Sequence, residues 1–122
     1  MGSPISNPSP EIRIRGCPEL VLVWRGSEFR FVAEPGAVFS VGLERGSDLV
    51  VPGTYASRIH ASIRWHRNEF QLIDHSTNGT FLQLEDEQVS FVHRTAVRLW
   101  GTGFLSFGEP LALENALKFS HA

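Results

Sequence analysis

Short runs in which apolar and polar residues alternate constrain the fold of this chain more than any other feature. In residues 61–66, Ala61, Ile63 and Trp65 fall on one face, and the residues between them fall on the other. That period of two is typical of a β-strand with one buried face. Many short strands separated by turn residues predict an antiparallel β-sandwich or barrel. Comparable runs occur at residues 19–26, 28–33, 37–42, 48–51, 70–74, 80–84, 89–93, 96–100 and 104–108.

Only the stretch "PLALENALKF", residues 110–119, has helical spacing over ten residues. Two structures are compatible with it. It forms a short helix, or residues 116–120 form a last strand that pairs with the first strand.

Composition excludes several classes of function. The chain has 122 residues, 42% of them hydrophobic, which is enough for one domain with its own core. A net charge of −2 argues against a basic surface that binds nucleic acid or anionic membrane. The single cysteine, Cys17, permits no internal disulfide and no cysteine-based zinc site. We therefore expect neither a metal nor a cofactor.

The chain is expected to divide after residue 16. Residues 1–16, which begin "MGSPISNPSP", are interpreted as a cloning scar with a flexible linker, and residues 17–122 as the domain. No signal peptide or long apolar run is present, so we expect a cytoplasmic location. On that expectation Asn78-Gly79-Thr80 is not a glycosylation acceptor, and Asn78-Gly79 is a turn.

Two polar loops interrupt the alternating pattern, at residues 52–60 and 74–79. Both follow hydrophobic strands, and both are expected at one end of the sandwich, where loops on a rigid scaffold usually carry function. Their hydroxyls, amide and guanidinium suit the binding of a phosphate and a peptide backbone. These groups belong to Ser57, Arg58, Ser76, Thr77 and Asn78.

Four blocks of sequence resemble the forkhead-associated (FHA) domain. They are "VG" at residues 41–42, "DLVV" at 48–51, "SRIHA" at 57–61 and "STNGTF" at 76–81, within a resemblance that covers about residues 20–108. The resemblance implies an eleven-stranded β-sandwich of the SMAD/FHA type, whose loops at one end bind phosphothreonine peptides. It also implies a signalling module rather than an enzyme.

Three longer segments resemble the FHA modules attached to bacterial class III adenylate/guanylate cyclases. They are "ASRIHASIRW" (56–65), "LIDHSTNGTF" (72–81) and "GTGFLSFGEP" (101–110). This narrower resemblance implies a regulatory domain that is covalently linked to a cyclase domain.

The FHA resemblance implies a role for individual residues. Ser57 matches the serine that binds phosphate, and Arg58 follows it at a position that often assists. Thr77 matches a phosphate contact from the second loop, and Asn78 matches the asparagine that binds the main chain of the peptide. Three further residues match structural supports: His60 braces the Ser57 loop, while Gly42 and Gly79 permit the local backbone.

The chain departs from the family at one position. The family normally follows the first glycine with an arginine, the main cation on the phosphate, whereas here Gly42 is followed by Leu43. Arg45 lies two residues further on and is a candidate substitute, although Glu44 beside it would repel a phosphate.

Three functional readings therefore stand side by side. The first is a phosphothreonine-binding module whose partner is a phosphorylated protein or peptide. The second is an FHA-fold interaction module with weak or no phosphate dependence. The third is a hydrolase that uses Ser57, His60 and Asp74, although no oxyanion motif accompanies them. A metal site is disfavoured, because no ligand spacing recurs among His60, His66, His75 and His93.

Overall fold

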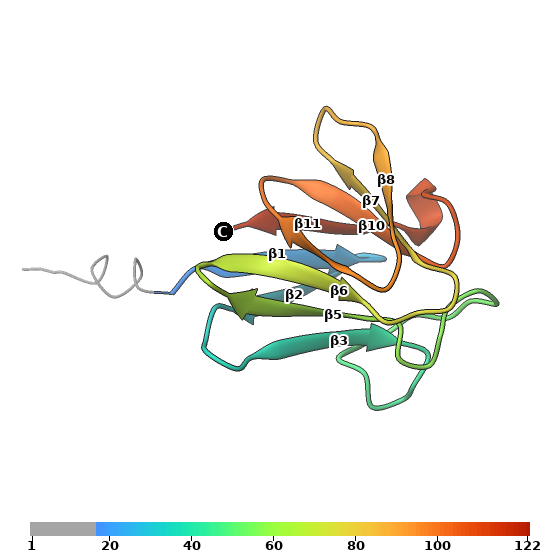
Figure 1. Cartoon of the computed structure of the whole chain (residues 1–122), viewed down its shortest axis with the longest axis horizontal. Helices are drawn as coiled ribbons and strands as arrows, with labels where there is room; N and C mark the ends of the chain where they lie inside the picture. The colour runs from blue at the N-terminus through green and yellow to red at the C-terminus, as the bar shows by residue number, and fades with distance from the viewer. Residues whose placement is uncertain (1–16) are drawn as a thin grey trace, which may run out of the picture.

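Two β-sheets pack face to face and enclose one core (Figure 1). The structure, a computed structural model, describes residues 17–122, so the expected scar and linker at residues 1–16 lie outside the described residues. The expected all-β sandwich of about eleven strands is confirmed. The part of the chain that is described contains no helix long and apolar enough to cross a membrane.

The two sheets contain six and five strands. The first has the order β2 (Ser27–Val32), β1 (Glu19–Trp24), β11 (Leu117–His121), β10 (Gly103–Phe107), β7 (Thr80–Leu84) and β8 (Val89–Val92). The second has the order β4 (Leu49–Val50), β3 (Val38–Gly42), β5 (Ala61–His66), β6 (Glu69–Asp74) and β9 (Ala96–Leu99).

One strand pair departs from the expected antiparallel arrangement. β3 and β4 run parallel, with Val41 opposite Leu49. The side chain of Asp48 explains this pairing, because its Oδ2 accepts a hydrogen bond from the Ser40 backbone N–H at 2.8 Å. The Asp48 N–H in turn donates to Ser40 Oγ at 3.0 Å. These reciprocal bonds hold the two-residue strand β4 beside β3 without a hairpin.

Two tight turns set the register of the hairpins. The β5–β6 turn uses Arg67 and Asn68, with φ of 52° and 63°. The β1–β2 turn uses Arg25 and Gly26, with φ of 48° and 84°. Positive φ at both central residues is the geometry that matches the twist of a two-residue hairpin.

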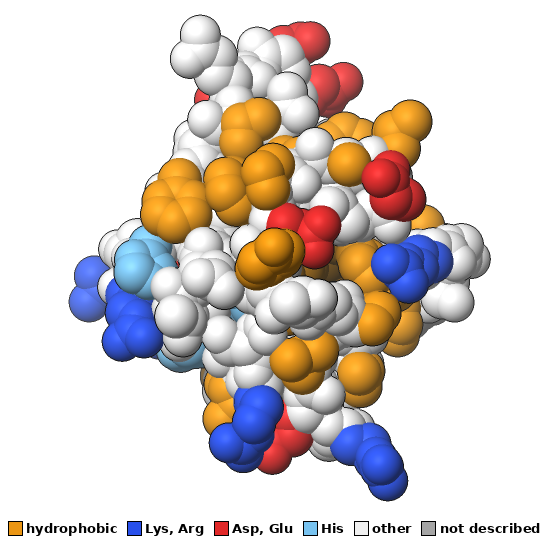
Figure 2. All heavy atoms as spheres, turned by 90° about the vertical axis from the view of Figure 1, so that its right-hand side faces the viewer, with side chains coloured by type: hydrophobic (Ala, Val, Ile, Leu, Met, Phe, Trp, Pro, Cys, Tyr) orange, Lys and Arg blue, Asp and Glu red, His pale blue; other side chains and the backbone are white. Residues whose placement is uncertain are grey.

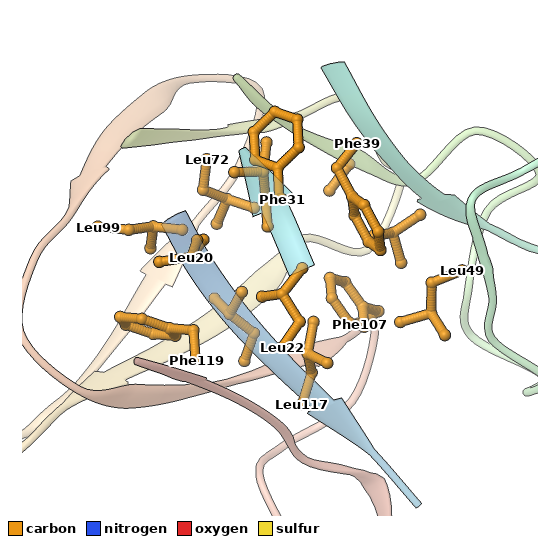
Figure 3. Close-up of a cluster of buried hydrophobic side chains, with 14 of the residues drawn as sticks. Leu20, Leu22, Phe31, Phe39, Leu49, Leu72, Leu99, Phe107, Leu117 and Phe119 are labelled. Carbon is orange, nitrogen blue, oxygen red and sulfur yellow. The ribbon is translucent and has the colours of Figure 1, made fainter. Parts of the chain in front are cut away.

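The core lies between the inner faces of the sheets (Figure 3). Ile63 is fully buried, as expected from the alternation in β5. Trp65 is only half-buried, which corrects the expectation that it would be buried. It stands next to the β5–β6 turn, where its ring packs edge-on against Phe70 at 4.9 Å and closes the rim of the core.

The tail forms a strand, and it forms a short helical turn as well. A 3₁₀ helix, η1, spans Leu113–Asn115, and β11 follows it. β11 pairs with β1, as the strand alternative predicted, and with β10 on its other side. Phe119 and Leu117 are fully buried, so β11 contributes to the core as well as to the sheet.

Candidate functional site

The register of β5 on β6 brings the two polar loops together. Ala61 lies opposite Asp74, so the end of the first loop and the start of the second leave the sheet side by side. The His75 N–H donates to the His60 carbonyl at 2.9 Å and extends this pairing beyond the strands. Residues that are far apart in sequence therefore meet at one end of the sandwich, as expected.

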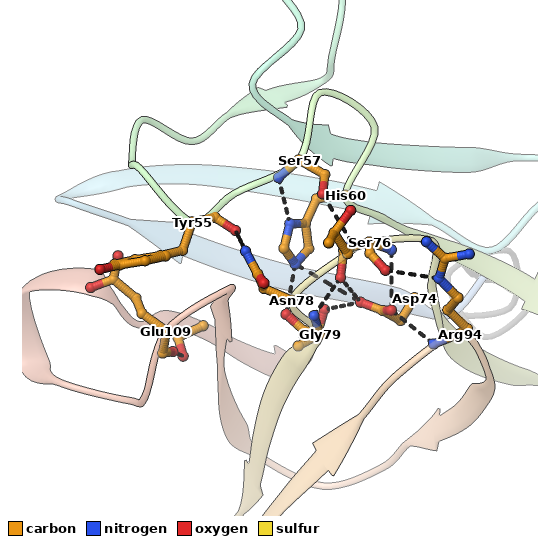
Figure 4. A network of polar contacts seen from close by, with 12 residues as sticks. Tyr55, Ser57, His60, Asp74, Ser76, Asn78, Gly79, Arg94 and Glu109 are labelled. Carbon is orange, nitrogen blue, oxygen red and sulfur yellow. Dashed lines mark hydrogen bonds and ion pairs between the residues drawn. The ribbon is translucent and has the colours of Figure 1, made fainter.

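Two hydrogen bonds join the loops at the surface (Figure 4). The Thr77 N–H donates to Ser57 Oγ at 3.1 Å. Asn78 Nδ2 donates to the Tyr55 carbonyl at 3.0 Å. Ser57, Thr77 and Asn78, three of the residues predicted for the site, therefore lie together.

His60 bridges the loops from beneath. Its ring is fully buried. Nδ1 accepts a hydrogen bond from the Ser57 N–H at 3.0 Å, so Nε2 carries the proton and donates to the Gly79 carbonyl at 2.8 Å. Burial lowers the pKa of His60 below its ordinary 6.5, although the Gly79 carbonyl and the carboxylate of Asp74 oppose the shift. The ring is a neutral brace inside the site.

Asp74 is the second buried anchor. Its Oδ2 accepts from the N–H groups of Ser76 and Arg94, at 3.1 and 2.8 Å. Its Oδ1 accepts from the hydroxyls of Ser76 and Thr80, at 2.8 and 2.7 Å. Burial raises the pKa of Asp74, but these hydrogen bonds outweigh burial and bring it below its ordinary 3.8. The carboxylate is charged and fixes the base of the second loop.

Ser76 connects Asp74 to the Asn78-Gly79 turn. Its Oγ accepts a hydrogen bond from the Gly79 N–H at 2.7 Å while donating to Asp74. Gly79 has φ of +87°, and a Cβ there would strike the ring of Phe91. The predicted Asn78-Gly79 turn is therefore held on both sides, and only glycine fits its last position without strain.

Gly42 supports the first loop through close contact rather than through an unusual backbone angle. A Cβ on Gly42 would strike the carbonyl of Arg58. The two residues after it donate backbone hydrogen bonds to that loop, from Leu43 to Ser57 and from Glu44 to Arg58, each at 3.0 Å. The backbone that follows β3 is therefore hydrogen-bonded to the Ser57 loop.

Within residues 17–122, neither predicted cation has its side chain hydrogen-bonded to Ser57. Arg58 Nη2 lies 3.4 Å from Oε1 of Glu44, and both side chains are exposed. Arg45 is in the β3–β4 loop, and residues 17–122 provide no ion pair for it. Leu43 is 37% exposed at the position where the family places arginine. Figure 2 shows this end of the molecule, where Lys and Arg side chains lie apart at its margins and hydrophobic side chains are numerous.

Several contributors were missed by sequence reasoning. Arg94 fixes the second loop through its backbone, and its Nε donates to the Ser76 carbonyl at 3.1 Å. Nothing in the sequence links Arg94 to a loop about twenty residues earlier. The role of Asp74 could have been predicted from the sequence. An Asp side chain often accepts a hydrogen bond from the backbone N–H two residues later, which here is that of Ser76.

The arrangement does not form a hydrolase triad. Both ring nitrogens of His60 are bound to backbone groups, so the ring has no free nitrogen to accept a proton from Ser57. Within residues 17–122, no three His, Cys, Asp or Glu side chains are grouped as metal ligands would be.

Comparisons with known proteins agree with this geometry. A model of the FHA domain family matches residues 39–99, half of the 122-residue chain. The solved FHA-1 domain of Mycobacterium tuberculosis Rv1747 is 28% identical over 87% of this chain and 98% of that chain, with a TM-score of 0.67. No curated protein matches the chain.

Two further solved structures show the same fold at lower identity. The FhaA FHA domain, in complex with the intracellular domain of Rv3910, is 20% identical over 86% of this chain and 99% of that chain, with a TM-score of 0.56. The yeast Dun1 FHA domain, in complex with a doubly phosphorylated (pT) peptide derived from Rad53 SCD1, is 23% identical over 87% of this chain and 74% of that chain, with a TM-score of 0.52.

Proposed function

This chain belongs to the FHA domain family, and on that premise we propose that it is a signalling module that binds phosphothreonine peptides between its two polar loops. The domain is an interaction module and not an enzyme, as its family membership shows. One observation carries the proposal. Ser57, Thr77 and Asn78 lie together at the surface, on loops that buried His60 and Asp74 hold in place.

The free hydrogen-bonding capacity of these residues suits a phosphopeptide. Ser57 Oγ accepts from the Thr77 N–H, which leaves its hydroxyl hydrogen to donate to a phosphate oxygen. Asn78 uses one N–H on Tyr55, which leaves its second N–H and its carbonyl oxygen for the main chain of a peptide. The loops are already joined, so little ordering is required when the ligand binds.

The charge of the site predicts weak binding. Hydrogen bonds with an ionised partner are roughly twice as strong as neutral ones, and a bidentate guanidinium holds a phosphate best. Leu43 supplies no charge, and Arg58 is directed at Glu44. We expect the dissociation constant to be tens of micromolar or weaker, a binding free energy of about −6 kcal/mol. Release of Arg58 from Glu44, or approach of Arg45, would strengthen the site.

The second candidate function is an interaction that does not depend on phosphate. The exposed Leu43 favours it, because an apolar side chain stands where a phosphate would need a cation. A ligand of this kind would bind the loops through main-chain contacts with Asn78 and apolar contacts with Leu43.

Two finer proposals rest on the sequence alone. We propose that the domain regulates a covalently linked bacterial nucleotide cyclase, because three of its segments resemble cyclase-attached FHA modules. We also propose a cytoplasmic location, where the phosphorylated partner would be found. The full open reading frame tests the first proposal: an upstream cyclase domain would support it, and an unrelated neighbour would refute it.

A phosphothreonine peptide library, applied to the immobilised domain beside the same library without phosphate, tests the binding function. Enrichment of phosphorylated peptides by the wild-type domain, and its loss in Ser57→Ala, is the expected result. Equal retention of both libraries would establish the phosphate-independent function instead.

A further inference from the structure

Four strands end the two sheets, and β8 differs from the other three. Within residues 17–122, β2 has the charged residues Glu28 and Arg30, β9 has Arg98, and β4 is only two residues long. β8, with the sequence "VSFV", has no charged residue. Charges and short length are the usual means by which an edge strand avoids pairing with another chain. β8 has neither charge nor extreme shortness.

The exposed side chains of β8 are apolar. Val89 is 49% and Phe91 57% exposed, on the outer face of the six-stranded sheet. The ring of Phe91 lies 5.2 Å from that of Phe81 on β7 and 5.8 Å from that of His93. An apolar surface therefore continues from β7 to the open edge. An exposed hydrophobic edge of this kind is a site for strand addition.

We propose that two copies of this chain pair along β8 in antiparallel fashion and join their six-stranded sheets into one. The arrangement goes beyond peptide binding, because it uses β8 and the residues that flank it rather than Ser57 or Asn78. Its basis is the self-complementary order of four exposed residues. Val89 and Phe91 lie on β8, and Glu87 and His93 flank it on either side.

The alternation of side chains selects the register. Residues directly opposite each other in an antiparallel pair point to the same face, so the two-fold axis must pass through a residue. With the axis at Ser90, Val89 of each copy faces Phe91 of the other, an aromatic and β-branched pair that stabilises sheets. The same register places Glu87, just before β8, opposite His93, just after it.

The neighbouring registers lack this match. An axis at Phe91 places Val89 opposite His93, and an axis at Val89 places Glu87 opposite Phe91. Both arrangements set a charged or polar group against an apolar one. The two pairs of Val89 with Phe91, and the placement of Glu87 opposite His93, therefore favour a second copy in one register over an arbitrary extended peptide.

Sedimentation equilibrium of the full chain over a wide concentration range tests the proposal. The wild type is expected to shift from the 13.6 kDa monomer toward twice that mass as its concentration rises. Val89→Lys should weaken association by about tenfold or more, since lysine at a sheet edge opposes strand pairing. Val38→Lys is the matched control, because Val38 on β3 is 56% exposed and lies outside β8. Thermal melts of both variants establish that they are folded.

A charge-exchange experiment separates self-pairing from capture of another strand. Glu87→Lys places a cation opposite His93, and His93→Glu places two acids opposite each other, so each variant alone should associate more weakly than the wild type. In an equimolar mixture of the two variants, the lysine introduced at 87 faces the glutamate introduced at 93, and the original Glu87 faces the original His93. The mixture should therefore associate more strongly than either variant alone. A wild type that stays monomeric at all concentrations would overturn the proposal. Equal weakening by Val89→Lys and Val38→Lys, or a mixture no stronger than its components, would overturn it too.

Discussion

His60 shows how one side chain can determine the geometry of the site without contacting a ligand. It joins the Ser57 N–H to the Gly79 carbonyl inside the sandwich. His60→Ala would leave both backbone groups without a partner in a buried place. We expect the free energy of unfolding to fall by about 1–3 kcal/mol, the cost of such unsatisfied groups. Urea melts measure it, and an unchanged midpoint accompanied by lost binding would instead make His60 a ligand residue.

The lowered pKa of His60 predicts a pH dependence of stability. As the pH falls through the ordinary value of 6.5, the unfolded chain takes up a proton on this ring and the folded protein does not. The free energy of unfolding should therefore decrease from about pH 7 downward and level off below the folded pKa. His60→Ala should abolish this decrease, while His66→Ala, on the outer face of β5, should retain it. The same dependence of the free energy of unfolding on pH in all three proteins would disprove the assignment to His60.

Protonation of Asp74 should also decrease the free energy of unfolding, but at lower pH than the effect of His60. Its folded pKa lies below the ordinary 3.8, so its contribution is complete above that pH and is lost as the pH falls through the folded pKa. The two groups thus give acid denaturation in two separate pH windows.

Ser57 and Asn78 are predicted to contact the ligand, in contrast to His60. Ser57→Ala and Asn78→Ala should each weaken phosphopeptide binding by about 1–3 kcal/mol, because each removes a contact to the ligand. Their free energies of unfolding should change far less than that of His60→Ala. Ser120→Ala, on β11 and away from the loops, is the control. A calorimetric titration in which either variant binds as tightly as wild type would remove that residue from the site.

The Asn78-Gly79 turn packs against strand β8, because Gly79 lies directly against the ring of Phe91. Gly79 and Gly36 both have positive φ, +87° and +82°, but only Gly79 has a neighbour, the ring of Phe91, where a Cβ would lie. Both Gly→Ala variants should lose about 1–2 kcal/mol of stability from the left-handed backbone. Gly79→Ala should lose about 1 kcal/mol more, because the ring must leave its packing on Phe81.

A double-mutant cycle with Phe91→Ala tests this connection. Removal of the ring should bring the loss in Gly79→Ala down to that in Gly36→Ala, since the contact then no longer exists. An excess loss that persists without the ring would mean that the strain lies in the backbone of the turn alone.

Most strands could be predicted because each shows its own alternation. In β5 and β6 the alternating pattern alone identifies the buried face, and the turn residues 67–68 lie between them. The partner of β4 could not be predicted, since two residues show no period and the parallel pairing depends on the contact of Asp48 with Ser40. The half-burial of Trp65 depends on its place beside the turn at the rim of the core, which periodicity does not encode.

The candidate site could be predicted only in part, for a related reason. Loop residues such as Ser57 and Asn78 stand out as polar interruptions of an apolar pattern. The four-donor environment of Asp74 includes Thr80 and Arg94 and exists only after β7 has joined the first sheet and β9 has paired with β6. Likewise, the ion pair of Arg58 with Glu44 depends on how the β3–β4 and β4–β5 loops pass each other, which spacing does not determine.

For the molecule as a whole, charge is the feature that sets affinity. The net charge is −2, so no general positive field attracts a phosphate. The loops of the site provide neutral donors, and Arg58, which follows Ser57 in the sequence, is paired with Glu44. We therefore expect the residues of the phosphothreonine site to be correctly arranged but to bind a phosphopeptide weakly.

Restoration of the missing cation tests this claim most directly. In a calorimetric titration of wild type and Leu43→Arg with one peptide in phosphorylated and unphosphorylated form, the wild type should bind the phosphopeptide weakly. Leu43→Arg should bind it about tenfold more tightly or better, about 1.4 kcal/mol per decade, and should leave the unphosphorylated peptide unaffected. A Leu43→Arg variant that binds the phosphopeptide no better than wild type, or a wild type that already binds it at nanomolar concentration, would contradict the account.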